Sequence, residues 1–453
     1  MRRKASRFEH PASARCRAWD RFACVGMGPH FRAGLSGEVI HHVTVHARPA
    51  GVSRCFLVVE TQKGPSMRFG GSIIGALFKP LSRRSVAASV ARHGGDAYDK
   101  VFRTWDHLVA LVFAQLSGAQ SLRSLVAQWN AHSHHHYHLG TGKLARSTLA
   151  DANGRRPVAI FAEIFAVLSG LAERALRREG AAMLRLIDAT PIPLDALVGW
   201  AAWNGRTRGL KLHVVYDPAS DHPRRIAITP ATVNDVEVGR AVPIEPGATY
   251  VFDKAYCHYG FWTRIHAAGA GFVTRQKKNA RYRALRQRPL CQTKGDGFVV
   301  LADDEVKLVS KGNAKLAIPM RRIRVRREQG GILTLITNDL ARSAVEIAAL
   351  YKVRWQIELL FRWIKQHLKL RKFLGRCENA VRLQLLAAMI SYLLLRIAAR
   401  QARLALPALR FAELISCCLF TRKPLARIDK PPEVNPSKPQ TRVHTNQLEF
   451  CYA

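Results

Sequence analysis

The chain has 453 residues, and its 71 Lys and Arg against 32 Asp and Glu give a net charge of +39. A hydrophobic content of 48 % excludes a disordered basic tail, and the length suits two or three domains with a large core. A folded protein this basic most often has a polyanion as its partner, and the usual polyanion is nucleic acid.

The first 66 residues show no sustained helical or strand period, unlike the rest of the chain. We expect Met67 to be the natural start and residues 1–66 to be a mis-started or disordered extension. The alternative is a basic arm that binds DNA.

The sequence predicts neither secretion nor a membrane span. The basic start, Met1–Lys4, is not followed by an apolar core segment. The apolar stretch Leu383–Leu395 is too short to cross a bilayer and predicts a buried helix within C-terminal helices at 376–425, which a Pro-rich tail follows at 426–453. Nine Cys without a C-x-x-C pattern indicate reduced thiols. We therefore expect a cytoplasmic protein.

Residues 67–180 are predicted to form a helical N-terminal domain. Helices are expected to begin at Thr104, at Ser121 and at Ser147. Such short helices suit a helix-turn-helix-like module, so the domain is a DNA-binding candidate, although most three-helix stretches bind no DNA. The His-rich segment 132–138 is expected to be a solvated loop, with a metal site as the alternative.

Residues 181–375 have the pattern of an α/β domain. Two short apolar strands each end in an acid, Leu184–Asp188 and Tyr250–Asp253. Residues 280–330 carry β-type runs and many Arg, which predict an inserted β region with a basic face.

A long helix is predicted after Ser343, because Ser343 and Glu346 match a capping box. Four side chains along this helix can carry chemistry: Tyr351, Arg354, Glu358 and Lys365. At about 100° per residue they point within roughly 60° of one another, away from the apolar stripe. The helix therefore presents a carboxylate flanked by two cations and a phenol.

Arg354 and Glu358 alone predict no more than a structural salt bridge. Asp188 and Asp253 change that interpretation, because sites gather at strand ends in α/β sheets. Three carboxylates at one place repel each other unless a cation holds them together, and Mg²⁺ prefers oxygen ligands. Two such ions about 4 Å apart can activate a nucleophile and stabilise the leaving oxygen of a phosphodiester.

These residues resemble a known family. The helix matches Y-x2-R-x3-E-x6-K, the signature of the DDE insertion-sequence transposases of the "IS-four" family, through Tyr351, Arg354, Glu358 and Lys365. Ile187–Thr190 and Phe252–Tyr256 resemble the first-Asp and second-Asp segments of that family. The resemblance covers the chain from about Met67 to about residue 425.

The resemblance implies an RNase-H-like catalytic core with a β-strand insertion, preceded by a helical DNA-binding domain. It also implies that three acids are catalytic and bind two Mg²⁺ (or Mn²⁺) ions: Asp188, Asp253 and Glu358.

Expected DNA contacts lie around these acids. The resemblance implies phosphate contacts for Tyr351, Arg354 and Lys365. Three more cations follow a strand near the proposed site and are expected to contact phosphate: Arg275, Lys277 and Lys278. The arginines within 321–327 line a DNA groove or face solvent, and the pattern does not favour either. Trp355 and Trp363 are expected to pack rather than to stack on bases.

The implied activity is that of a bacterial transposase. It would bind the terminal inverted repeats of its element as double-stranded DNA, cleave the ends, and join the freed 3′-hydroxyl to target DNA. A homodimer is implied, since two ends must be held together. Two alternatives stay open: a stand-alone metal-dependent nuclease and a non-catalytic DNA-binding derivative.

Overall fold

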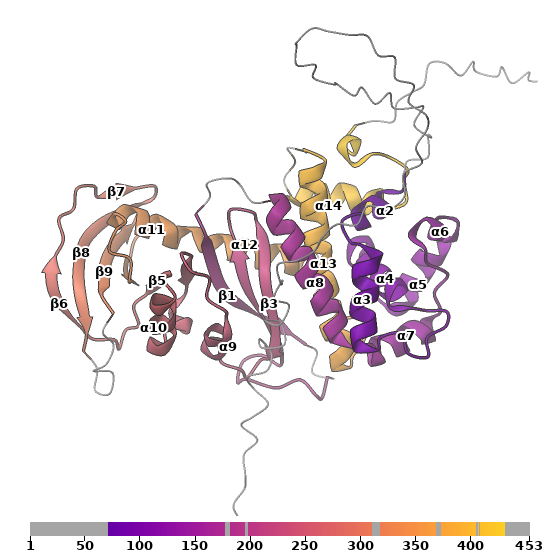
Figure 1. Ribbon diagram of the computed structural model, residues 1–453, viewed down its shortest axis with the longest axis horizontal. Helices are drawn as coiled ribbons and strands as arrows, with labels where there is room; N and C mark the ends of the chain where they lie inside the picture. The colour runs from indigo at the N-terminus through magenta and orange to yellow at the C-terminus, as the bar shows by residue number, and fades with distance from the viewer. Residues whose placement is uncertain are drawn as a thin grey trace, which may run out of the picture.

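The computed structural model describes residues 71–176, 182–194, 198–309, 318–367, 373–404, 406 and 408–430. The extension expected at residues 1–66 and the tail beyond residue 430 lie outside these ranges. Figure 1 shows three parts side by side: helices at one end, a sheet covered by helices in the middle, and the strands of the insertion at the other end.

The N-terminal part is helical, as predicted. Ser121 begins its helix as expected, since its hydroxyl accepts a hydrogen bond from the Ser124 amide. The helix expected to be capped by Thr104 instead starts with that residue, because Asp96 accepts hydrogen bonds from its amide and hydroxyl. The helices are α2 (Ile73–Phe78), α3 (Arg83–His93), α4 (Thr104–Ser117), α5 (Leu122–Ala131), α6 (His136–Leu139), α7 (Arg146–Arg155) and α8 (Val158–Leu176).

The His-rich segment forms short helical turns rather than a solvated loop. His136 is buried, stacks on Trp129 and hydrogen-bonds its carbonyl oxygen. Phe420 stacks on His132 and His135 from the C-terminal segment. The ordering therefore comes from aromatic neighbours that the local sequence does not show.

The C-terminal helices α13 (Glu378–Gln401) and α14 (Ala408–Cys417) pack on the N-terminal helices. Helix α13 lies against α4 and α8 and contacts the sheet at its edge strand. By length and composition α13 could cross a membrane, but 89 % of its most apolar window is buried inside the protein. The buried helix predicted around Leu383–Leu395 is confirmed.

The central sheet has the order β3-β2-β1-β4-β5, followed by the strands of the insertion. Strands β1, β2 and β3 are antiparallel neighbours, whereas β1, β4 and β5 are parallel. This arrangement is the predicted RNase-H-like core. The strands are β1 (Leu184–Pro193), β2 (Gly209–Asp217), β3 (His222–Pro230), β4 (Thr249–Phe252) and β5 (Gly271–Arg275).

Helices cover both faces of this sheet. Alternate residues of a strand point to opposite faces, so neighbours such as Val251 and Phe252 belong to different cores. Val251 shares its core with Ile357, whereas Phe252 packs with Phe261. The helices are α11 (Ala344–Val353) and α12 (Trp355–His367) on the first side, and α9 (Asp235–Ala241) and α10 (Tyr259–Ala267) on the second.

The predicted β insertion extends the same sheet. Strand β10 (Ile332–Thr337) pairs with β5 on one side and with β9 (Met320–Arg327) on the other. The remaining strands follow outward: β8 (Phe298–Leu308), β6 (Tyr282–Gln287) and the short β7 (Lys294–Gly295). A continuous sheet fixes the insertion relative to the core.

One arginine of the insertion neither lines a groove nor faces solvent. Arg321 is 1 % exposed, and its Nη2 lies 2.6 Å from Asp303 Oδ2. Its Nη1 also donates to the carbonyl oxygens of Asp339 and Arg342, just before α11. Arg322 pairs with Asp304, while the exposed members are Arg324, Arg326 and Arg327.

Breaking the buried pair should destabilise the protein. Arg321→Met would leave the buried Asp303 carboxylate with the more distant Arg288, whose Nε lies 3.8 Å from Asp303 Oδ2, so we expect the free energy of unfolding to fall by about 3 kcal/mol. The double variant Arg321→Met with Asp303→Leu should recover most of that loss. Urea unfolding followed by circular dichroism measures both, and a single variant as stable as wild type would contradict the prediction.

Candidate active site

The two aspartates lie side by side on adjacent parallel strands. Ile187 of β1 is paired with Phe252 of β4, and Asp188 and Asp253 are the next residues on each strand. Asp253 follows the end of β4, as predicted. Asp188 does not end its strand, because β1 continues to Pro193 through antiparallel pairing with β2. Asp188 instead marks the point where the parallel pairing of β1 ends.

The predicted long helix is two helices with a break at Arg354. The capping box at its start is confirmed: Glu346 Oε2 accepts from the Ser343 amide at 2.7 Å, and Ser343 Oγ accepts from the Glu346 amide at 3.2 Å. At the break, the Arg354 amide donates to the Tyr351 carbonyl, and the Arg354 carbonyl accepts from the Ile357 amide. These three-residue spacings tighten the backbone locally.

Arg354 joins two of the three predicted acids. Its Nη2 donates to Glu358 Oε1 at 2.6 Å, and its Nη1 lies 3.4 Å from Asp188 Oδ2. The side chain is only 16 % exposed, and Nε is buried with no hydrogen-bond partner among the described residues. The pair expected to be a local salt bridge is therefore a bridge between α12 and β1.

Tyr351 and Arg275 face the third acid. The Tyr351 hydroxyl donates to Asp253 Oδ1 at 3.4 Å, and Arg275 Nη1 lies 3.8 Å from the same oxygen. Burial raises the pKa of Tyr351 to about 12, so the phenol keeps its proton at neutral pH. The structure thus gathers six predicted residues at one place: Asp188, Asp253, Glu358, Tyr351, Arg354 and Arg275.

The other predicted contacts lie further out. Lys277 donates from Nζ to the Cys257 carbonyl at 3.0 Å, and Lys278 is exposed in the loop after β5. Lys365 lies on α12 about two turns beyond Glu358 and is half-buried.

Asp188 carries an unbalanced charge. Burial raises its pKa to about 6, while the Ala189 amide and Arg354 act to lower it. Glu358 and Asp253 add to the rise, because their like charges are close. One guanidinium therefore does not neutralise the cluster.

The donor set fits a divalent cation only if Arg354 yields its place. Among the described residues, no three His, Cys, Asp or Glu side chains are close enough to hold one metal ion. Carboxylate oxygens are nevertheless the ligands that Mg²⁺ and Mn²⁺ prefer. Arg354 occupies the position between Asp188 and Glu358.

Two aromatic residues near the site were not assigned a role from the sequence. Tyr256 is 1 % exposed, and its hydroxyl has no hydrogen-bond partner among the described residues. Its pKa is raised well above the ordinary value by burial and by the charges of Asp188, Asp235 and Asp253. Trp355, expected to pack, is 49 % exposed. The helical wheel already placed Trp355 on the face of the predicted site residues, because it points only about 40° away from Tyr351.

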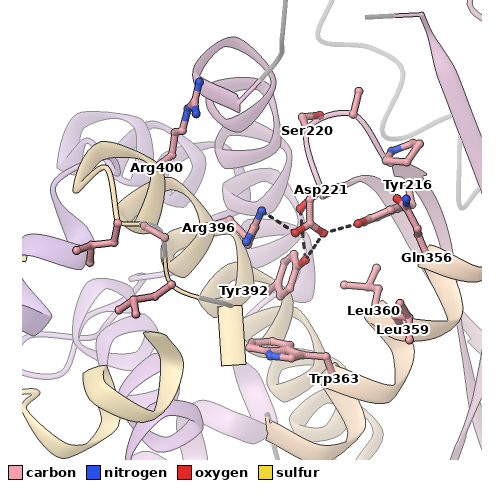
Figure 2. A pocket seen from close by; sticks show the side chains of 15 residues that line it. Tyr216, Ser220, Asp221, Gln356, Leu359, Leu360, Trp363, Tyr392, Arg396 and Arg400 are labelled. Atoms are coloured by element: carbon pink, nitrogen blue, oxygen red, sulfur yellow. Dashed lines mark hydrogen bonds and ion pairs between the residues drawn. The ribbon is translucent and has the colours of Figure 1, made fainter. Parts of the chain in front are cut away.

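Two cavities flank α12. One of about 410 Å³ lies between the insertion and α11, and its walls include Tyr351, Arg354 and Trp355. The other, of about 770 Å³, is lined by Gln356, Leu359 and Leu360 of α12 and by residues of α13 and the β2–β3 turn (Figure 2). The three predicted acids do not line the smaller cavity, but two of its wall residues, Tyr351 and Arg354, contact them.

In the larger cavity, Asp221 is the central polar group. Its carboxylate lies 2.6 Å from Arg396 Nη2 and accepts a hydrogen bond from the Tyr392 hydroxyl at 2.9 Å (Figure 2). These contacts connect α13 to the turn between β2 and β3. Trp363 packs edge-on against Tyr392, as expected for a packing residue.

Comparisons with known proteins identify the family of the chain. Residues 179–394 match the family described as "Transposase DDE domain", and residues 70–142 match a "Domain of unknown function (DUF4372)". The chain is 60 % identical over 304 residues to "Putative transposase y4zB" of Sinorhizobium fredii, which covers 67 % of this chain and 85 % of that protein.

Two further similar proteins have lower sequence identity to the chain. The chain is 29 % identical over 260 residues to "Probable transposase for insertion sequence element IS5377" of Geobacillus stearothermophilus, covering 57 % of this chain and 68 % of that protein. A solved piggyBac transposase synaptic complex with hairpin DNA gives a TM-score of 0.43 at 8 % identity, covering 80 % of this chain and 83 % of that one.

The chain belongs to the DDE-domain transposases. It is a transposase of an insertion sequence, as the resemblance predicted. Enzymes of this family act on DNA and generally depend on divalent metal ions.

Removing Arg354 should make the protein more responsive to Mg²⁺. Without metal, Arg354→Ala should lower the free energy of unfolding by about 1–2 kcal/mol, because two half-buried carboxylates lose their shared cation. Added Mg²⁺ should then raise the thermal midpoint more in the variant than in wild type. Arg382→Ala, which breaks the i,i+4 pair with Glu378 away from the site, is the matched control. Equal Mg²⁺ responses in the wild type and the Arg354 variant would contradict the prediction.

Replacing Asp188 should stabilise the metal-free protein at neutral pH. Its folded pKa of about 6 lies above the ordinary value of 3.8 for this side chain, so the folded state binds this proton more tightly. The cost is absent below about pH 4, grows as the pH rises through 6, and reaches up to about 3 kcal/mol above it. Asp188→Asn should raise the thermal midpoint at pH 7.5, with a gain that shrinks toward pH 4. Asp151→Asn, at an exposed position, is the control and should leave the thermal midpoint at pH 7.5 unchanged.

Proposed function

We propose that Asp188, Asp253 and Glu358 are the catalytic residues and that they hold two Mg²⁺ or Mn²⁺ ions. The observation that carries this proposal is the convergence of the three acids: two follow the last parallel pair of β1 and β4, and Arg354 links the third to Asp188. The bound ions would supply Lewis-acid stabilisation of charge on phosphodiester oxygens. The substrate would be the double-stranded DNA at the ends of the element, and the freed 3′-hydroxyl would then be joined to target DNA.

The flanking side chains would position the phosphate. Tyr351 keeps its proton at neutral pH, so its hydroxyl can donate to a phosphate oxygen as it now donates to Asp253. Arg354 and Arg275 present guanidinium groups that suit bidentate phosphate contacts. Lys365, Lys277 and Lys278 would add charge along the same strand of DNA.

The smaller cavity supports a path for the DNA strand. Its walls join the insertion to Tyr351 and Arg354, so a strand lying in it would reach the carboxylates. Arg327 lines this cavity, and the exposed Arg324 and Arg326 extend the positive charge along β9. Non-specific phosphate contacts of this kind dominate DNA affinity.

The N-terminal helices would bind the element's ends. Helix α7 packs against α5 and exposes hydrogen-bonding side chains in its first turns, namely Arg146, Ser147 and Thr148. This arrangement suits a helix that enters the major groove. Two chains, as a homodimer, would hold the two ends together in the bacterial cytoplasm.

Cleavage of end DNA tests the proposed site. With Mg²⁺ and duplexes taken from both termini of the element, wild type should cut at the element boundary and transfer precut ends to a plasmid. Asp188→Ala, Asp253→Ala and Glu358→Ala should each lower both rates by more than about 100-fold while still binding the duplex.

Exposed acids serve as controls for this test. Asp151→Ala should cleave and transfer as wild type does. Undiminished cleavage in the three acid variants would remove the proposed site, and cleavage without transfer of precut ends would favour a stand-alone nuclease.

A further inference from the structure

The loop between α3 and α4 displays two apolar side chains directly to solvent. Tyr98 is 100 % exposed and Val101 is 92 % exposed. Both values are extreme for residues of this type, which ordinarily bury much of their surface. The backbone of Tyr98 also has a φ of 68°, which lies in the left-handed region. Residues other than Gly adopt this region at a cost in free energy.

Ion pairs and hydrogen bonds to the buried Arg156 hold this loop in place. Arg156 is 3 % exposed, and its Nη1 lies 2.7 Å from Asp96 Oδ1 while its Nη2 lies 3.1 Å from Asp99 Oδ2. Arg156 also donates to the Phe102 carbonyl, and Asp96 accepts from the amide and hydroxyl of Thr104 at 2.6 Å each. Gly95 lies so close to Ile160 that any side chain there would overlap it. The exposure of Tyr98 and Val101 is therefore imposed by contacts that a frayed loop would lack.

The acidic side chains of the loop face inward, whereas its basic side chains face solvent. Its acids, Asp96 and Asp99, face inward onto Arg156, and their side chains are 26 % and 18 % exposed. The cations Lys100 and Arg103 are exposed, and Arg155 at the end of α7 is 64 % exposed beside Asp99. The outer surface around the two apolar side chains is thus positive. Such a surface attracts a polyanion and repels a protein partner that is also positively charged.

We propose that the Tyr98–Val101 loop is a DNA-contact tip that inserts against a base step of the element's end. The Tyr98 ring would stack on a base exposed at that step, and Val101 would fill the space beside it. Lys100, Arg103 and Arg155 would contact the flanking phosphates. The proposal rests on the proposed binding of end DNA, and it assigns the contact to a loop that lies beside α7 rather than to α7 alone.

Tyr98→Gly separates a role in binding from a role in folding. Gly removes the ring and also relieves the left-handed backbone, so the variant should have a thermal midpoint equal to or above that of wild type. Its affinity for a 40-base-pair end duplex should be at least about 5-fold weaker, measured by fluorescence anisotropy with the full chain. The control is Tyr137→Ala, which removes the ring of another exposed tyrosine. Ala rather than Gly is chosen because the backbone of Tyr137 is helical, and this variant should bind the duplex as wild type does.

A second measurement reports the insertion itself. With 2-aminopurine at successive positions of the end duplex, wild type should change the fluorescence at one step, and Tyr98→Gly with Val101→Ser should abolish that change. End binding and fluorescence equal to wild type in these variants would overturn the tip while leaving the catalytic proposal intact. A shift in oligomeric state on size-exclusion chromatography without a change in DNA affinity would also overturn it. Failure of wild type to bind end duplexes would overturn both proposals.

Discussion

The contact on which the site depends is the bridge from Arg354 to Asp188 and Glu358. Parallel pairing of β1 with β4 places two aspartates next to each other, and α12 adds a third acid. Like charges at this distance repel, so a cation is required in the folded state. Arg354 supplies only part of that charge, since the pKa of Asp188 stays raised by burial and by its acidic neighbours. Negative charge at the cluster is therefore only partly compensated by Arg354.

The rest of the fold keeps this edge of the sheet in place. The insertion continues the central sheet through β10, and buried Arg321 connects it to the segment before α11. On the other side, α13 joins the N-terminal helices to the β2–β3 turn through Tyr392 and Asp221. The first attachment uses the buried pair of Arg321 and Asp303, and in the second the buried Tyr392 donates a hydrogen bond to the partly exposed Asp221. Paired polar groups of this kind make the geometry of both attachments specific. DNA that touches all three parts would therefore meet surfaces with fixed relative positions (Figure 1).

Charge is arranged by the same principle throughout the molecule. Acids such as Asp303, Asp96 and Asp99 are turned inward onto buried arginines. Exposed cations are left on the surface of the insertion and around the Tyr98–Val101 loop. In these parts of the described chain the cations therefore lie where a polyanion can reach them, while the acids at the active site are clustered around Arg354.

The local sequence pattern was sufficient to predict many of the helices and strands and to single out three acids as candidates. The capping box at Ser343, the apolar strands before Asp188 and Asp253, and the buried helix around Leu383–Leu395 depend on neighbours in the chain, so the sequence by itself determined them. Long-range contacts decided the rest. Only the pairing of β1 with both β2 and β4 places Asp188 within its strand, and contacts with Asp303, Asp339 and Arg342 make Arg321 a core residue. The break at Arg354 and the exposure of Tyr98 likewise depend on partners far along the chain, because a side chain's charge balance and burial are set by what folds against it.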